Sequence, residues 1–176
     1  MWIFVYGSLM WNLDNLQPHI RAKKKAILYG LHRDFNKASI ENWGTKTNPA
    51  PTLGLKRGDK CVGVAYEIDD NKRDRVIALL NNREGTHFTI AKKRIEVKDI
   101  GMINAFYPYN KRDSSFLGRK SLKRRAKMAI MARGTNGSCI NYVKNTRKEA
   151  EKLGVKDEYI EKFWMEIENL NSRIIH

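Results

Sequence analysis

Two short stretches of this chain carry residue types that could do chemistry together. The first is an apolar run that ends abruptly in Tyr6, Gly7, Ser8 and Leu9. A strand that stops in such a turn places several backbone N–H groups at one end of a sheet, where they can hold a carboxylate or an oxyanion. Taken alone, the same four residues also fit an ordinary tight turn after a buried strand.

Glu84 is the best single candidate for acid–base chemistry. It lies between Arg83 and Gly85, after a short amphipathic segment and before a strand-like one, and we interpret it as a loop residue. A carboxylate that takes and returns a proton contributes roughly 10²–10⁴-fold to a rate. With a reference pKa of about 4.3 it is a poor base, and burial in a low-dielectric cavity would raise that pKa. No Ser-His-Asp spacing supports Ser8 as a nucleophile.

The net charge of the chain is strongly positive. Its 176 residues include 34 Lys and Arg against 19 Asp and Glu, which gives +15. This length fits one domain with a sizeable core. The charge fits a nucleic acid, an acidic membrane surface or a small anionic substrate as partner. We interpret the basic runs as solvated faces of separate elements: Lys23–Lys25, Lys92–Arg94 and Lys123–Arg125.

The cysteines and histidines predict no metal site. Cys61 and Cys139 lie far apart without a CxxC pair, which is typical of reduced thiols in the cytoplasm. The histidines lack ligand spacing: His19, His32, His87 and His176. No apolar stretch reaches the length of about 18 residues that a membrane-spanning helix needs. The first apolar run also lacks the flanks of a signal peptide, so we expect a cytoplasmic protein.

The segments that must position these residues predict an α+β fold. Strand-like segments dominate up to residue 110, at 2–6, 21–38, 52–55, 61–68, 87–97 and 102–107, with one short helix at 71–81. We expect 52–55 and 61–68 to form a hairpin around Arg57–Asp59, and Pro108 to break the last strand. Because no βαβαβ alternation is present, this order favours a small barrel or a strongly curled sheet.

The last third of the chain is predicted to be helical. Ser121 begins one helix, a second runs from about Ser138 to Leu153 and stops at Gly154, and Asp157 begins a third. Apolar residues of the third helix recur every three or four positions, which is typical of a core face. We expect a single domain over residues 1–176, with a barrel core of about 1–110 and a helical part of about 115–172.

Motifs along the whole chain follow the order seen in one known family. The opening WIFVYGSLMWN and the later LLNNRE segment around Glu84 carry the likeness first. Further segments match in order: RAKKKAILYGLHRDF with Ser39, CVGVAYEI, AFYP, ARGTNG and LGVKD. The chain thereby resembles the γ-glutamylcyclotransferase superfamily, specifically its ChaC-like, glutathione-degrading branch. It departs from that branch at Trp43, where Arg usually precedes the Gly-Thr pair, and in a shorter segment after Glu84.

The resemblance implies a small closed β-barrel with flanking helices and a cavity at one end. It implies that Tyr6, Gly7, Ser8 and Leu9 bind a γ-glutamyl group, that Glu84 is the acid/base, and that Tyr107 lines the cavity. The implied reaction converts glutathione to 5-oxoproline and cysteinylglycine, and it requires no metal, cofactor or covalent intermediate. A basic rim would attract this small anionic substrate.

Three alternatives remain open from the sequence. Trp43 and the short segment after Glu84 leave another γ-glutamyl amine or peptide as the substrate. A basic module that binds nucleic acid or an acidic surface would explain the charge, but we do not expect it because the chain lacks a recognition motif such as paired aromatics. The third is a barrel that has lost catalysis and serves as a scaffold. The sequence specifies no oligomeric state.

Overall fold

The computed structural model describes residues 1–172, and residues 173–176, with His176, lie outside the described part. The main sheet is a closed barrel in the order β1-β3-β2-β4-β5. Its strands are β1 Trp2–Val5, β2 Ile20–Ser39, β3 Ala50–Ile68, β4 Phe88–Val97 and β5 Gly101–Asn110. β1 pairs in parallel with β5 and antiparallel with β3, so the barrel is mixed. The predicted α+β class with a small barrel and C-terminal helices is confirmed.

The chain forms two compact units. The first contains Met1–His32 and Lys56–Lys111, and the second contains Arg33–Leu55 and the chain from Arg112 onward. The long strands β2 and β3 contribute residues to both units.

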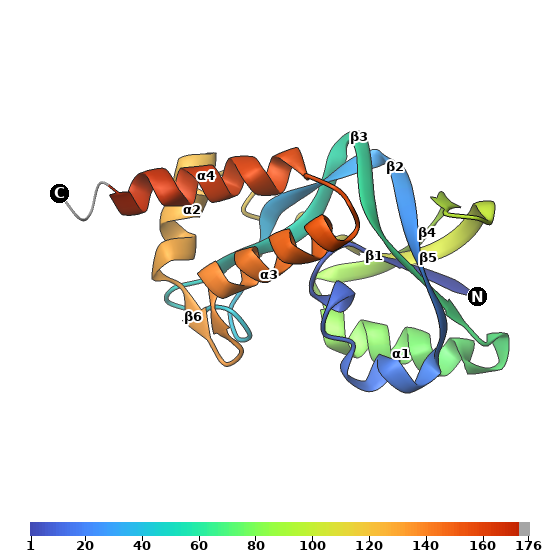
Figure 1. Cartoon of the computed structure of the whole chain (residues 1–176). Helices are drawn as coiled ribbons and strands as arrows, with labels where there is room; N and C mark the ends of the chain where they lie inside the picture. The colour runs from blue at the N-terminus through green and yellow to red at the C-terminus, as the bar shows by residue number, and fades with distance from the viewer. Residues whose placement is uncertain (173–176) are drawn as a thin grey trace. The chain divides into compact units, whose positions relative to one another are not determined.

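In the first unit, the hairpin of β4 and β5 packs against β1 through β5 and against α1 through β4 (Figure 1). The hairpin is paired along its whole length, from Phe88↔Asn110 to Val97↔Gly101. α1 spans Arg73–Glu84 and packs against β4, burying Val76 and Leu80 one turn apart. A 3-10 turn at Asp70–Lys72 precedes α1. The predicted helix at 71–81 is thus confirmed in type and extends three residues further.

The predicted hairpin around Arg57–Asp59 is wrong, because β3 continues through these residues. Gly58 serves here as a strand residue that gives space to a neighbour: an added Cβ would lie 2.1 Å from Cδ2 of His32. Pro108 likewise does not break β5, where it pairs with Ile90. Proline removes one backbone donor but keeps its carbonyl, and in this strand that carbonyl accepts the Tyr6 hydroxyl.

In the second unit, three helices begin at the residues expected from the sequence. Ser121 accepts a hydrogen bond from the Arg124 N–H at the start of α2 (Leu122–Met131). Ser138 does the same for α3 (Cys139–Lys152), and Asp157 caps α4 (Glu158–Ser172). α2 and α3 both pack against α4 (Figure 1). A two-stranded hairpin of β6 (Arg133–Gly134) and β7 (Gly137–Ser138) joins α2 to α3.

Two buried arginines attach the helices of the second unit to β2. Arg33 donates to Asp157 at 2.8 Å, and Arg125 donates to Asp34 at 2.6 Å and to the carbonyl of Phe35 at 2.9 Å. Arg33 is fully buried and Arg125 nearly so. The basic run Lys123–Arg125 is therefore not wholly a solvated face, because its last residue belongs to the core.

Candidate active site

The end of β1 is held tightly within the first unit. β1 pairs with β3 from Trp2↔Glu67 to Val5↔Val64. Gly63 of β3 permits this close approach, since an added Cβ would lie 2.3 Å from the carbonyl oxygen of Val5. The turn that follows β1 therefore begins from a fixed point in the barrel.

The predicted turn after β1 is a short 3-10 helix, Ser8–Met10. The carbonyl of Gly7 accepts from the Met10 N–H at 2.9 Å, and the carbonyl of Ser8 accepts from the N–H groups of Trp11 and Asn12. None of these bonds uses the N–H groups of Gly7, Ser8 or Leu9. The predicted loop beyond it contains a second 3-10 helix, Asp14–His19 (called η2).

Tyr6 and Leu9 fasten the two ends of this turn to the barrel. Tyr6 is 3% exposed, stacks on Phe4, and donates its hydroxyl proton to the carbonyl of Pro108 at 2.9 Å. Leu9 is equally buried, and its carbonyl accepts the hydroxyl of Tyr66 at 3.2 Å. Tyr6 thus lies beside the strand segment that carries Tyr107.

Glu84 is the last residue of α1, which corrects its interpretation as a loop residue. The helix continues this far because Gly85 ends it with φ 69° and ψ −172°, a conformation that is nearly restricted to glycine. The Gly85 N–H donates to the carbonyl of Asn81 at 2.9 Å. The half-buried Glu84 therefore projects from a rigid element rather than from a flexible loop.

Arg83 connects the end of α1 to the segment that follows β1. Its Nη1 forms an ion pair with Asp14, and its Nη2 lies 3.5 Å from the Ser8 hydroxyl. α1 and η2 also pack together. The structure thereby places the Ser8 turn next to the residue that precedes Glu84.

Tyr107 is a buried phenol on β5. It pairs with Ala91 and meets Tyr109 edge to face, with 6.2 Å between the ring centroids. Burial, and next the charge of Tyr109, raise the pKa of Tyr107 above its usual value. The Tyr107 hydroxyl therefore keeps its proton at neutral pH and can act as a hydrogen-bond donor.

The candidate residues of the sequence analysis all lie in the first unit. Tyr6 is hydrogen-bonded to Pro108, which follows Tyr107 in the chain. Ser8 contacts Arg83, which precedes Glu84. Sequence reasoning gave no role to Arg83 or Asp14, which are 69 residues apart in the chain. The only local signal was a cation in the last turn of a helix, where it interacts favourably with the helix dipole.

Trp43 lies in the second unit, in the loop between β2 and β3. Its ring packs against that of Tyr142, with 5.2 Å between the centroids, and its backbone N–H donates to the Ser39 hydroxyl. The carbonyls of the two residues before Trp43, Glu41 and Asn42, accept hydrogen bonds from the N–H groups of Thr135 and Asn136 in the β6–β7 hairpin. Several segments that carry the family resemblance thus meet around Trp43.

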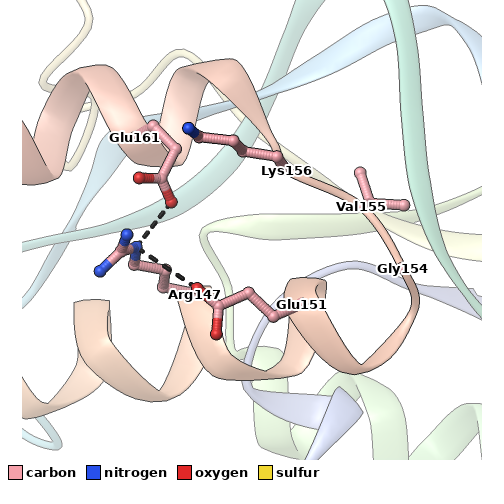
Figure 2. Close-up of a pocket in the computed structure, with 6 residues that line it drawn as sticks. All are labelled: Arg147, Glu151, Gly154, Val155, Lys156 and Glu161. Atoms are coloured by element: carbon pink, nitrogen blue, oxygen red, sulfur yellow. Dashed lines mark hydrogen bonds and ion pairs between the residues drawn. The ribbon is translucent and has the colours of Figure 1, made fainter.

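A polar pocket in the second unit is a weak candidate for a site. Figure 2 shows its residues: Arg147, Glu151, Gly154, Val155, Lys156 and Glu161. Arg147 donates to Glu161 at 2.6 Å and lies 3.7 Å from Glu151, and the bond to Glu161 raises the pKa of Arg147. The central cation of this pocket is already neutralised by two carboxylates, so the pocket offers little attraction to an anion.

The part of the chain from residue 1 to residue 172 contains no group of three His, Cys, Asp or Glu side chains placed to hold a metal ion. Among its helices, none has both the length and the apolar character needed to cross a membrane.

Comparison with known proteins defines the class to which this fold and site belong. The model of the ChaC-like protein family matches residues 1–170, and the chain belongs to that family. The match spans both compact units.

Two relatives resemble the chain over most of its length. Gamma-glutamylcyclotransferase 2-3 of Arabidopsis thaliana is 29% identical over 175 residues, covering 91% of this chain and 84% of its own. The glutathione-specific gamma-glutamylcyclotransferase of Escherichia coli K12 is 27% identical over 176 residues, covering 97% and 74%. The crystal structure of a glutathione-specific γ-glutamyl cyclotransferase from yeast superposes with a TM-score of 0.85 at 18% identity, covering 96% of each chain. This last likeness identifies the fold.

Proposed function

We propose that this chain is a γ-glutamyl cyclotransferase that converts glutathione to 5-oxoproline and cysteinylglycine. The observation that carries the proposal is the placement of the Ser8 turn against the end of α1 that bears Glu84, in a member of the ChaC-like family. The names of the two relatives, one of them glutathione-specific, support the same activity.

The proposed reaction needs little from the protein beyond positioning and proton transfer. The α-amine of the γ-glutamyl group attacks the γ-carbonyl, a five-membered lactam forms, and the bond to the cysteinyl nitrogen breaks. Well-oriented intramolecular attack of this kind gains effective molarities on the order of 10⁵–10⁸ M. In our proposal Glu84 accepts one proton of the substrate ammonium and delivers it to the leaving nitrogen. The ring nitrogen then loses its second proton, which Glu84 passes to the freed cysteinyl amine.

The other candidate residues are proposed to bind the substrate. The Ser8 and Leu9 N–H groups, which the turn does not use, would hold the substrate carboxylate and the oxyanion that develops on the γ-carbonyl. The protonated Tyr107 would line the cavity as a neutral donor. Tyr6 would hold the start of the turn in place, since its hydroxyl donates a hydrogen bond to the carbonyl of Pro108.

Glutathione is proposed over other γ-glutamyl compounds, although Trp43 stands where the branch usually has Arg. The test is to incubate the purified protein with glutathione and with a panel of γ-glutamyl amines and dipeptides, and to measure 5-oxoproline by mass spectrometry. We expect release from glutathione at the highest kcat/KM. Release from none of the compounds would overturn the cyclotransferase proposal, and release only from another member would replace the substrate.

We further propose that residues 1–176 act as one catalytic domain in the cytoplasm. The family match across both compact units supports the first point, and two cysteines without a disulfide support the second. Fractionation of cells that express the tagged protein would test the location. Recovery outside the cytoplasm would contradict it.

A further inference from the structure

Arg83 is the residue through which the end of α1 touches the segment after β1. One guanidinium nitrogen pairs with Asp14 at the start of η2, and the other lies 3.5 Å from the hydroxyl of Ser8. The Arg83 side chain is 20% exposed, against 56% for Asp14. A planar guanidinium presents donors in a fixed fork, so it can hold two acceptors in one geometry.

Asp14 has a backbone that must be held in place. Its φ is 43°, in the left-handed region, which is energetically unfavourable for a residue other than glycine. The N-cap residue of η2 is Leu13, whose apolar side chain cannot accept a hydrogen bond from the first turn. The ion pair with Arg83 supplies an attachment for this strained residue, and with it for the whole segment between β1 and β2.

We propose that Arg83 is a positioning residue that sets the distance between the substrate-binding turn and the catalytic carboxylate. Arg83 and Glu84 are consecutive in a helical turn, so a guanidinium fixed on Ser8 and Asp14 fixes the backbone from which Glu84 projects. This inference rests on the proposed cyclotransferase function.

The contacts of Arg83 favour this role, and kinetics separate it from direct substrate binding. The two terminal nitrogens of Arg83 already face oxygen atoms of the protein, one in Asp14 and one in Ser8. A residue that acts by positioning should lower kcat when it is removed, because the turn and Glu84 then adopt productive geometry less often. A residue that binds the substrate directly should mainly raise KM.

The experiment compares Arg83→Met, Arg83→Lys, Asp14→Asn and the double variant Arg83→Met with Asp14→Asn. Arg75→Met is the matched control, since Arg75 is an exposed cation on the same helix. Steady-state kcat and KM with glutathione are measured for each folded protein, together with circular dichroism. If glutathione is not the substrate, the best compound of the panel takes its place.

Arg83→Met is expected to lower kcat roughly 10- to 100-fold, because a misplacement near 1 Å costs on the order of 10²-fold. Asp14→Asn should also lower kcat. The double variant should be little worse than Arg83→Met alone, because both substitutions remove the same ion pair. Arg83→Lys should recover part of kcat, and Arg75→Met should match the wild type.

Three outcomes would overturn the inference while leaving the cyclotransferase function intact. They are an unchanged kcat in Arg83→Met, a rise in KM alone, or full additivity of the two substitutions. Should Arg83→Met fail to fold, an unchanged kcat in Asp14→Asn would overturn it equally. A wild-type protein inactive on every γ-glutamyl compound would instead overturn the proposed function itself, which separates the two failures.

Discussion

The hydroxyl of Tyr6 donates to the carbonyl of Pro108 across 2.9 Å, although 102 residues separate the two. This bond joins the residue before the Gly7 turn to the residue after Tyr107. It also explains how proline occupies the middle of β5, because the proline contributes its acceptor rather than a donor.

Removing this hydroxyl should destabilise the fold. In Tyr6→Phe the buried Pro108 carbonyl loses its donor, and we expect the free energy of unfolding to fall by about 1–3 kcal/mol. Urea titration followed by tryptophan fluorescence measures it. Tyr29→Phe is the matched control, because the Tyr29 hydroxyl bonds to Glu96 at the exposed surface and its loss should change little. Equal midpoints for Tyr6→Phe and wild type would contradict the argument.

Glu84→Gln should abolish turnover and keep the fold. The amide has nearly the shape of the carboxylate but cannot accept the ammonium proton, so we expect 5-oxoproline formation to fall at least about 10²-fold. Mass spectrometry measures the product, and thermal melting checks the fold. Glu67→Gln removes a carboxylate at the opposite end of β1, beside Trp2, and should remain active. A fully active Glu84→Gln protein would remove Glu84 from the mechanism.

Gly85→Ala should reduce both stability and kcat. At φ 69° and ψ −172° an alanine is strained by about 1–3 kcal/mol, and relief of that strain unwinds the turn that carries Glu84. Gly101→Ala is the matched control, because Gly101 also has a positive φ, 95°, with open space around it, but lies at the start of β5. We expect both variants to melt earlier and only Gly85→Ala to lose kcat. An unchanged kcat in folded Gly85→Ala would show that the helix end tolerates the change.

The buried thiol of Cys139 should lower the free energy of unfolding at alkaline pH. Burial raises the pKa of its thiol from 9.0 to about 12, so the folded state keeps the thiol proton that the unfolded state releases. The stabilisation is complete below pH 9 and is lost as the pH rises towards 12, with a slope near 1.4 kcal/mol per pH unit. Denaturant titrations at several pH values should show a shallower decline for Cys139→Ala than for wild type. Parallel curves would contradict the assigned cause.

Elements with a local signal could be predicted from the sequence. The starts of α2, α3 and α4 follow from Ser121, Ser138 and Asp157, because a capping side chain bonds to N–H groups only two or three residues away. β1 and the long β2 follow from their apolar patterns in the same way.

The errors arose where distant residues decide the local structure. Gly58 gave a turn signal, but the ring of His32 fills the space beside it and the strand continues. Glu84 looked like a loop residue because two asparagines precede Arg83, yet α1 extends to Gly85. The contact of Arg83 with Asp14 has no signature in the sequence, since only the folded barrel brings the two residues together.

The pairing of Ile3 with Phe106 sets the order of events during synthesis of the chain. β1 needs a partner strand that emerges from the ribosome about a hundred residues later, which takes roughly 5–20 s at ordinary elongation rates. Until then the apolar Trp2–Val5 segment lacks this neighbour, and the Gly7 turn lacks the anchor that Tyr6 makes with Pro108. The candidate site can therefore form only after the first unit is almost fully synthesised, and until then β1 has only β3 as its partner strand.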